Sequence, residues 1–205
     1  PAAIDNSFWG PGDAWRDAAT GIHVDVIFWS VAWTDDQVDR VLSWYEAAVG
    51  YSTCVWHTIR ISQVLFDRQG WFHKLQERAN APYPEPLVRA ILAKNYPILR
   101  QHESAYLHQL EKAVARGDRV SVNHRVAAFL ASYFDILFAI NRVPHPGEKR
   151  LIDLAEQRCP RLPEDMRNYI EGLLRAAAHA DQRLLTQLGA LIDRLDALLQ
   201  AEGLS

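Results

Sequence analysis

A chain of 205 residues, 49% of them hydrophobic and seven of them tryptophan, is long enough to bury a core and to form one large domain or two small ones. The net charge of −3 argues against a protein that coats nucleic acid non-specifically, and Arg125 and Asp135 interrupt the most apolar segment, so we expect no membrane span. Cys54 and Cys159 are too few for a disulfide framework and lack metal-ligand spacing, which favours a soluble globular protein of the cytoplasm.

The N-terminal segment combines a turn-rich stretch with one strand. Residues 1–21 carry glycine, proline and tryptophan without a helical period, which predicts an ordered loop with one short strand around Phe8. Residues 22–31 (IHVDVIFWSV) have apolar side chains on both faces, as is typical of a strand covered on both sides. His23 and Asp25 share one face of it because strand side chains alternate. The simplest structural role for Asp25 is that of an edge-strand residue facing water.

From Thr34 onward every pattern is helical. The sequence TDDQ, which begins at Thr34, predicts a capping box, and the helix should continue at core spacing to Val49 before Gly50 ends it. A second helix is predicted to end at Arg68 and a third to begin at Gly70.

The clearest linker is the segment NAPYPEP at residues 80–86. Its three prolines within five residues stiffen the chain and forbid a regular helix. We therefore expect an α/β part over residues 1–80 and a helical bundle over residues 81–205. The predicted fold class is α+β, predominantly α.

The bundle should be organised around one buried helix. Asp118 is predicted to be the N-cap of a helix that extends to Ile140 and is apolar on nearly every side. The preceding helical pattern contains Pro97, so a kink or a break is expected near Asn95 and Tyr96. After a corner at residues 144–147, a short helix is expected, and then an apolar edge from Met166 to Leu198 predicts a long helix or a helix pair.

A polar stripe runs along the central helix. Its members follow the spacing of one helix face: Ser121, Arg125, Ala128, Ser132, Asp135, Ala139 and Arg142. In a structural interpretation, Asp135 pairs with Arg142 or with an arginine of a neighbouring helix. In a functional interpretation, the stripe lines a polar pocket together with residues of the following corner, Asn141, His145, Glu148 and Lys149. Both interpretations stay open at the level of sequence.

Several common catalytic motifs are missing from the sequence. There is no HExxH, no Cys/His cluster, no GxSxG and no Gly-rich phosphate loop. A structural role is therefore expected for most of the eight histidines.

Two segments, IHVDVIFWS and YFDILFAINRVPHPGEKRLIDL, resemble bacterial nucleotidyltransferase-superfamily proteins of the polymerase-beta-like type, which are related to aminoglycoside nucleotidyltransferases. The corner from Asn141 to Lys149 is the more particular signal. The resemblance implies that residues 1–80 hold residual strands of a nucleotidyltransferase-type sheet and that a helical bundle follows. It also implies three carboxylates that hold two Mg²⁺ ions on a nucleoside triphosphate, and it places the third carboxylate at Asp25.

The chain departs from this family at its start. Residues 1–24 contain neither the Gly-Ser turn nor the DxD pair that the family carries before its third carboxylate. If the resemblance holds, we expect those elements upstream of Pro1, and we expect no catalysis from these 205 residues alone.

Site roles follow from the resemblance and from charge. Asp25 would be a metal ligand or the catalytic base that takes the proton of the acceptor hydroxyl. Arg125, Arg142 and Lys149 are candidates to bind the nucleotide phosphates. The remaining polar residues would contact a small hydroxyl-bearing acceptor: Asp135, His145 and Glu148.

Two alternatives remain beside nucleotidyl transfer, and the oligomeric state is open. The chain could be a non-catalytic helical binding or regulatory module, or the stripe could be a structural ladder of ion pairs. A homodimer could also cover the apolar edge that the missing strands would leave.

Overall fold

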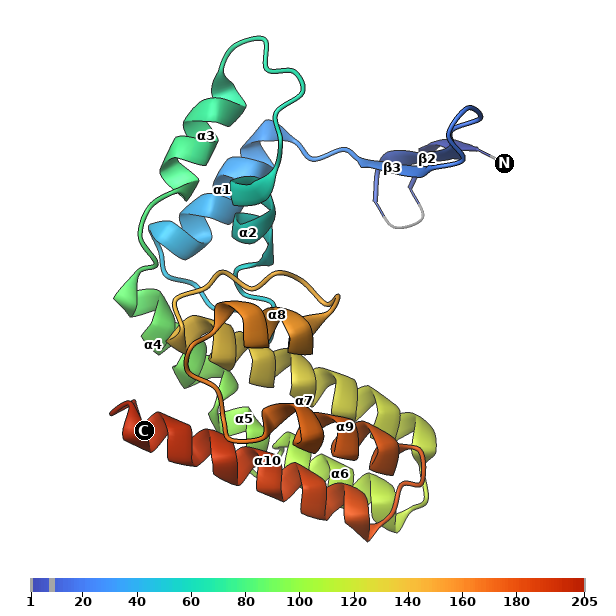
Figure 1. Ribbon diagram of the computed structural model, residues 1–205, viewed down its shortest axis with the longest axis vertical. Coiled ribbons are helices and arrows are strands. Elements are labelled where there is room, and N and C mark those ends of the chain that lie inside the picture. Colours follow the sequence, from blue (N-terminus) through green and yellow to red (C-terminus); the bar gives the residue numbers. More distant parts are fainter. Residues whose placement is uncertain (1, 8–9, 205) are drawn as a thin grey trace.

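A computed structural model describes residues 2–7 and 10–204. The architecture is α+β and predominantly α, as predicted. Figure 1 shows a small sheet at the N-terminal end, set apart from the helices and joined to them by an extended segment. Phe8, around which a short strand was predicted, lies outside the described residues.

The sheet is antiparallel and its strands lie in the order β1-β2-β3. The strands are β1 (Ala3–Asn6), β2 (Gly12–Arg16) and β3 (His23–Ile27). Gly12 lies opposite Ile27 in the register, and a Cβ at Gly12 would lie 2.2 Å from the Val26 carbonyl oxygen. Only glycine therefore allows the two strands to approach this closely.

The strand at His23–Ile27 is shorter and more exposed than predicted. The prediction that it is covered on both faces is wrong, since Ile27 is 65% exposed and the residues of β3 alternate between exposed and half-buried. The strand ends early because the next helix already begins at Val31.

The first helix, α1 (Val31–Leu42), is capped earlier than the TDDQ motif predicts. The Ser30 hydroxyl accepts a hydrogen bond from the Trp33 N–H at 3.2 Å, and Thr34 lies inside the helix. The helix also ends before Val49. Tyr45 adopts a left-handed conformation with φ 54°, and the Glu46 N–H donates to the Arg40 carbonyl at 2.7 Å, which closes the helix end.

Two further short helices pack against α1 and build a first core. They are α2 (Cys54–Ile61) and α3 (Trp71–Ala79). The buried Trp56 donates from its indole nitrogen to the Ala79 carbonyl at 2.6 Å, which joins α2 to the end of α3. This core also takes in Leu87, Ile91 and Ala139 from the bundle, so the segments before and after residue 80 share apolar contacts.

The bundle is built around the predicted central helix. Its first helices are α4 (Glu85–Asn95), α5 (Pro97–Arg100), α6 (Tyr106–Ala115) and α7 (Arg119–Ile140). The helix break before Pro97 is confirmed, as is the Asp118 N-cap, which accepts from the Ser121 N–H at 3.0 Å. Every residue from 131 to 140 is buried, so α7 is the hub of the larger core.

The C-terminal pattern is a helix pair, in line with one of the two predictions for it. The helices after the corner are α8 (Leu151–Arg158), α9 (Met166–Ala177) and α10 (Gln182–Ala201). In Figure 1, α8 lies on one side of α7 and the α9–α10 pair on the other.

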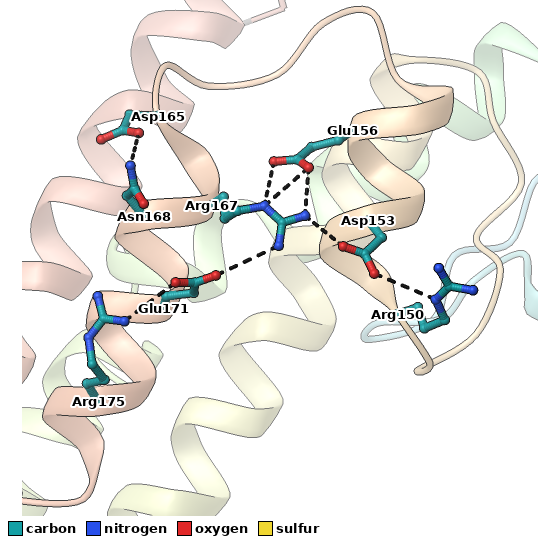
Figure 2. Close-up of polar contacts among 8 residues, drawn as sticks. All are labelled: Arg150, Asp153, Glu156, Asp165, Arg167, Asn168, Glu171 and Arg175. Carbon is teal, nitrogen blue, oxygen red and sulfur yellow. Dashed lines mark hydrogen bonds and ion pairs between the residues drawn. The ribbon is translucent and has the colours of Figure 1, made fainter.

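An exposed ion-pair network joins α8 to α9. Arg167 of α9 binds Asp153 and Glu156 of α8, each at 2.7 Å, and lies 3.7 Å from Glu171 one turn along α9 (Figure 2). The hydrogen bonds that Arg167 donates to Glu156 and Asp153 raise the pKa of its guanidinium and lower the pKa values of the two carboxyl groups.

Within residues 2–7 and 10–204, no helix combines the length and the apolar character that crossing a membrane requires.

Candidate functional site

The centre of the candidate site is Asp135, a fully buried residue of α7 that is 1% exposed. Its Oδ1 accepts the Ser52 backbone N–H at 3.0 Å, and its Oδ2 accepts the Ser52 hydroxyl at 2.6 Å. The Asn95 side-chain amide lies 3.4 Å from the same Oδ2. All of these donors are neutral.

The predicted ion pair between Asp135 and Arg142 is wrong. α7 ends at Ile140, and Arg142 lies beyond it with φ 55°, so its side chain leaves the stripe. Its guanidinium instead binds both carboxylate oxygens of Glu85, at distances of 2.9 to 3.1 Å. Within the described part of the chain, no salt bridge reaches Asp135.

The Asp135 carboxyl is buried with no salt-bridge partner among the described residues, and this raises its pKa. Desolvation raises its pKa to about 7, although the two hydrogen bonds from Ser52 oppose this shift. Unlike an exposed aspartate, the group therefore holds part of its protons at neutral pH.

Asn95 fastens the loop over residues 43–53 to the bundle. Its Oδ1 accepts the Gly50 N–H at 2.9 Å, and its Nδ2 donates to the Ala48 carbonyl at 3.0 Å. Gly50 has φ +72° and packs so closely on α7 that a Cβ there would lie 2.9 Å from the Cβ of Ala131. The loop is thus held from α4 and from α7 together.

His145 anchors the corner after α7 to the start of α2. The residue is fully buried, and its backbone N–H donates to the Thr53 hydroxyl at 2.7 Å. Its Nδ1 accepts the Gly147 N–H at 3.1 Å and lies 3.3 Å from the Cys54 sulfur, so we assign the ring proton to Nε2. Among the described residues Nε2 has no hydrogen-bond partner.

Cys54 and His145 do not form an activated nucleophile and base. Burial lowers the pKa of His145 to about 4, so its imidazole is neutral. Burial and the charge of Asp135 raise the pKa of the Cys54 thiol to about 12. A protonated thiol beside a neutral imidazole is a structural contact and not a thiolate poised for attack.

A small cavity opens beside Ser52, and we call it the Ser52 cavity. Its volume is about 140 Å³. The residues that line it come from α1, the loop and α2: Gln37, Arg40, Val41, Glu46, Ala48, Tyr51, Ser52, Val55 and Trp56. Arg40 and Glu46 pair with each other at 3.1 Å. The cavity therefore offers a hydroxyl, an amide and a paired cation and anion to a small polar molecule.

The structure gathers only some of the predicted site residues. Asp135 and His145 lie beneath residues 51–54, and Glu148 is close enough to Tyr51 that its charge, after burial, raises the pKa of the phenol. Lys149 is exposed. Arg125 lies elsewhere along α7 and lines a separate cavity of about 150 Å³ with Lys112 and Arg116.

Asp25 lies on β3, away from these residues. Its side chain is 67% exposed, and its Oδ2 lies 3.2 Å from Nδ1 of His23. The predicted shared face of His23 and Asp25 is thus confirmed. No group of three histidine, cysteine or acidic side chains arranged to hold a metal ion occurs in the part of the chain that the structure describes. The described residues therefore do not fit a complete Mg²⁺ site around Asp25.

One family model matches residues 53–151; its description is Domain of unknown function (DUF4037). No curated protein and no solved structure matches the chain. The DUF4037 match begins at Thr53 and ends at Leu151, so it spans α2 to α7 and the corner that follows. It includes Asp135 and His145 but not Ser52, which lies one residue before its start.

The residues predicted from the sequence did not include Ser52, Thr53 or Asn95. Asn95 carries a signal that could have identified it, because it follows Leu87, Ile91 and Leu92 on the buried face of α4 and is itself 0% exposed. A polar residue at a core position of a helix requires a hydrogen-bond partner. Ser52 and Thr53 lie in an irregular loop and carry no such signal.

Proposed function

We propose that this chain is a nucleotidyltransferase-like protein whose helical part binds the polar acceptor of the transfer. Two features support the proposal: the resemblance of residues 133–154 to that superfamily, and the Ser52 cavity. The observation that carries most weight is the buried Asp135, which holds Ser52 through neutral hydrogen bonds at the wall of a polar cavity.

The proposed acceptor site works through Ser52. The Ser52 hydroxyl donates to Asp135 and its oxygen accepts the Ala48 N–H at 2.9 Å, so one lone pair of the oxygen remains to accept a hydrogen bond from a ligand hydroxyl. Asp135 does not line the cavity and is a positioning residue in this proposal. Gln37 can both donate and accept, which suits a small hydroxyl-bearing ligand.

The transfer itself needs a nucleoside triphosphate and Mg²⁺, which neutralises phosphate charge and activates the attacking hydroxyl. In a complete protein we propose Asp25 as a metal ligand or base and Arg125 and Lys149 as phosphate ligands. Arg142 would have to exchange Glu85 for phosphate. The described residues do not by themselves build a complete site for the metal.

A second candidate is a binding or regulatory module without catalysis. The position of Asp25 favours it, since this exposed carboxylate lies on β3. Figure 1 shows the sheet set apart from α1 and α2, whose residues line the Ser52 cavity. In this case the cavity would bind a small polar ligand and no nucleotide would be used.

Calorimetry distinguishes the two candidates. The protein is titrated with ATP, with and without Mg²⁺, and then with a panel of small polyols and amino sugars. Nucleotidyl transfer predicts Mg²⁺-dependent heat with ATP that Asp25→Ala removes. A binding module predicts heat only with a member of the polyol panel, lost in Ser52→Ala and unchanged in Asp25→Ala. If neither ATP nor any panel member gives heat, the Ser52 cavity is not the site.

A further inference from the structure

A second cavity, which we call the basic pocket, lies on a different face of α2 from the Ser52 cavity. Its volume is about 290 Å³. Its walls come from α2, the end of α3, the corner after α7 and the end of α8: His57, Arg60, Ile61, Asn80, Val143, Pro144 and Arg158. Val55 and Trp56 line the Ser52 cavity, whereas the next residues of α2 line this one.

The basic pocket holds two arginines whose charge is not neutralised. Most arginines of this chain pair with a carboxylate, as Arg142 does with Glu85 and Arg167 with Glu156. Across residues 2–7 and 10–204, by contrast, neither Arg60 nor Arg158 forms a salt bridge or a side-chain hydrogen bond. The Arg60 guanidinium is placed by the Trp56 ring, whose centroid lies 5.5 Å away.

His57 lines the pocket with these arginines and is close enough to both that their charges affect its pKa. The residue is only 7% exposed, and its ring makes no hydrogen bond with any residue that the structure describes. Burial lowers its pKa, and the charges of Arg158 and Arg60 lower it further. A nearly buried, unpartnered imidazole beside two cations can donate a hydrogen bond to an anion that enters the pocket.

We infer that the basic pocket binds a tetrahedral oxyanion, namely a phosphate group, either free or carried by a small organic molecule. Two guanidinium groups from different helices can each donate two N–H bonds to phosphate oxygens. His57 and the Asn80 amide, which also line the pocket, add further donors. The inference does not depend on the proposed function, because it concerns a different cavity and different residues.

The shape of the pocket favours a phosphate group attached to an organic body. Ile61, Val143 and Pro144 add apolar side chains to the lining that the cationic groups share. An apolar portion of the ligand could pack there while the phosphate binds the arginines. Phenyl phosphate and inorganic phosphate therefore make a suitable pair of probes.

The test is a titration of the full chain, first with inorganic phosphate and then, in a separate sample, with phenyl phosphate. The readout of each titration is the ¹H–¹⁵N NMR spectrum. The amides of residues 57–61, 80 and 143 should shift and saturate. Arg60→Gln and Arg158→Gln should each weaken binding at least about tenfold, since each removes charge-assisted hydrogen bonds. Both side chains are exposed, so the variants should stay folded. Tighter binding of phenyl phosphate identifies a phosphate ester as the ligand, and equal binding identifies free phosphate.

Arg89→Gln is the matched control. Arg89 is an exposed arginine of α4 that lines a different cavity, and its replacement should leave the affinity unchanged. The inference is overturned if neither probe saturates at millimolar concentration. It is also overturned if Arg60→Gln and Arg158→Gln bind as tightly as the wild type, or if Arg89→Gln weakens binding to the same extent.

Discussion

Ser52 and Asp135 are 83 residues apart in the chain and are joined by two hydrogen bonds, from the Ser52 backbone N–H at 3.0 Å and from its hydroxyl at 2.6 Å. These neutral donors stand where an arginine would be expected beside a buried carboxylate. Asp135 therefore fixes the wall of the Ser52 cavity and keeps a pKa near neutrality.

Asp135 and His145 should have opposite effects on the pH dependence of stability. The pKa of Asp135 is raised from 3.8 to about 7, so between these values the folded state holds a proton that the unfolded state has lost. The free energy of unfolding then falls as pH rises. The pKa of His145 is lowered from 6.5 to about 4, so in that window the unfolded state holds the extra proton. The free energy of unfolding then rises with pH.

The two effects should cancel in the wild type between about pH 4 and 6.5. Single variants separate them. Relative to the wild type, Asp135→Asn should gain stability with rising pH and His145→Gln should lose it, each by up to ~1.4 kcal/mol per pH unit. Urea unfolding over this range provides the measurement. Parallel curves for all three proteins would show that neither group is shifted.

Ser52→Ala should destabilise the fold more at high pH than at low pH. The hydroxyl binds Asp135 most strongly when the carboxylate is charged, where such a bond contributes about 1.5–3 kcal/mol, against about 0.5–1.5 kcal/mol for a neutral partner. The measurement is urea unfolding at about pH 8 and about pH 5. Ser62→Ala is the control, because the Ser62 hydroxyl donates only to the Thr58 carbonyl. An equal loss of unfolding free energy at both pH values would mean that the strength of the Ser52–Asp135 hydrogen bond does not depend on the charge of the carboxyl.

Gly50→Ala should lower the free energy of unfolding by more than the left-handed conformation alone would explain. The new Cβ would meet Ala131 at 2.9 Å, and φ is +72°. Gly117→Ala isolates the backbone contribution, because Gly117 has φ +65° and no atom within 4 Å of its Cβ position. We expect Gly117→Ala to lower the free energy of unfolding by about 1–2 kcal/mol, and Gly50→Ala to lower it by a further ~1–3 kcal/mol. In chemical unfolding, the double variant Gly50→Ala/Ala131→Gly should be more stable than Gly50→Ala alone, because it removes the Ala131 Cβ that the new side chain meets. Equal losses for the two single variants would argue against close packing of the loop on α7.

Arg167→Gln should lower the melting temperature by an amount that depends on salt. Arg167 is the centre of the exposed network in Figure 2 and contacts carboxylates of both α8 and α9. Screening shortens the Debye length from roughly 30 Å at 0.01 M salt to roughly 3 Å at 1 M, so the difference between wild type and variant should shrink in thermal melts. Arg175→Gln, which removes a single pair with Glu171, is the control and should change the melting temperature less. A difference in melting temperature that does not depend on salt would mean that Arg167 stabilises the fold through packing and not through its ion pairs.

The elements that could be predicted are those determined by local sequence. Asp118 marks the start of the central helix, and Pro97 marks the helix break before it, because capping and proline act within one turn. The end of α1 could not be predicted, since it depends on the left-handed conformation of Tyr45, which sequence rules assign to glycine.

The candidate site could be predicted only in part, because its partners are distant in sequence. The polar stripe identified Asp135 as a buried acid that needs partners, and the corner identified His145. Their actual partners, Ser52 and Thr53, lie in a loop without a pattern. The basic pocket brings together α2 and the end of α8, and no local spacing connects Arg60 with Arg158.

The most direct test of this site is a ¹³C NMR titration of the Asp135 carboxyl carbon, assigned with Asp135→Asn. A buried carboxyl held only by neutral donors should titrate with a midpoint at about 7. A midpoint at or below about 4, the range of exposed or cation-paired aspartates, would contradict the buried and uncompensated state from which the Ser52 cavity is argued.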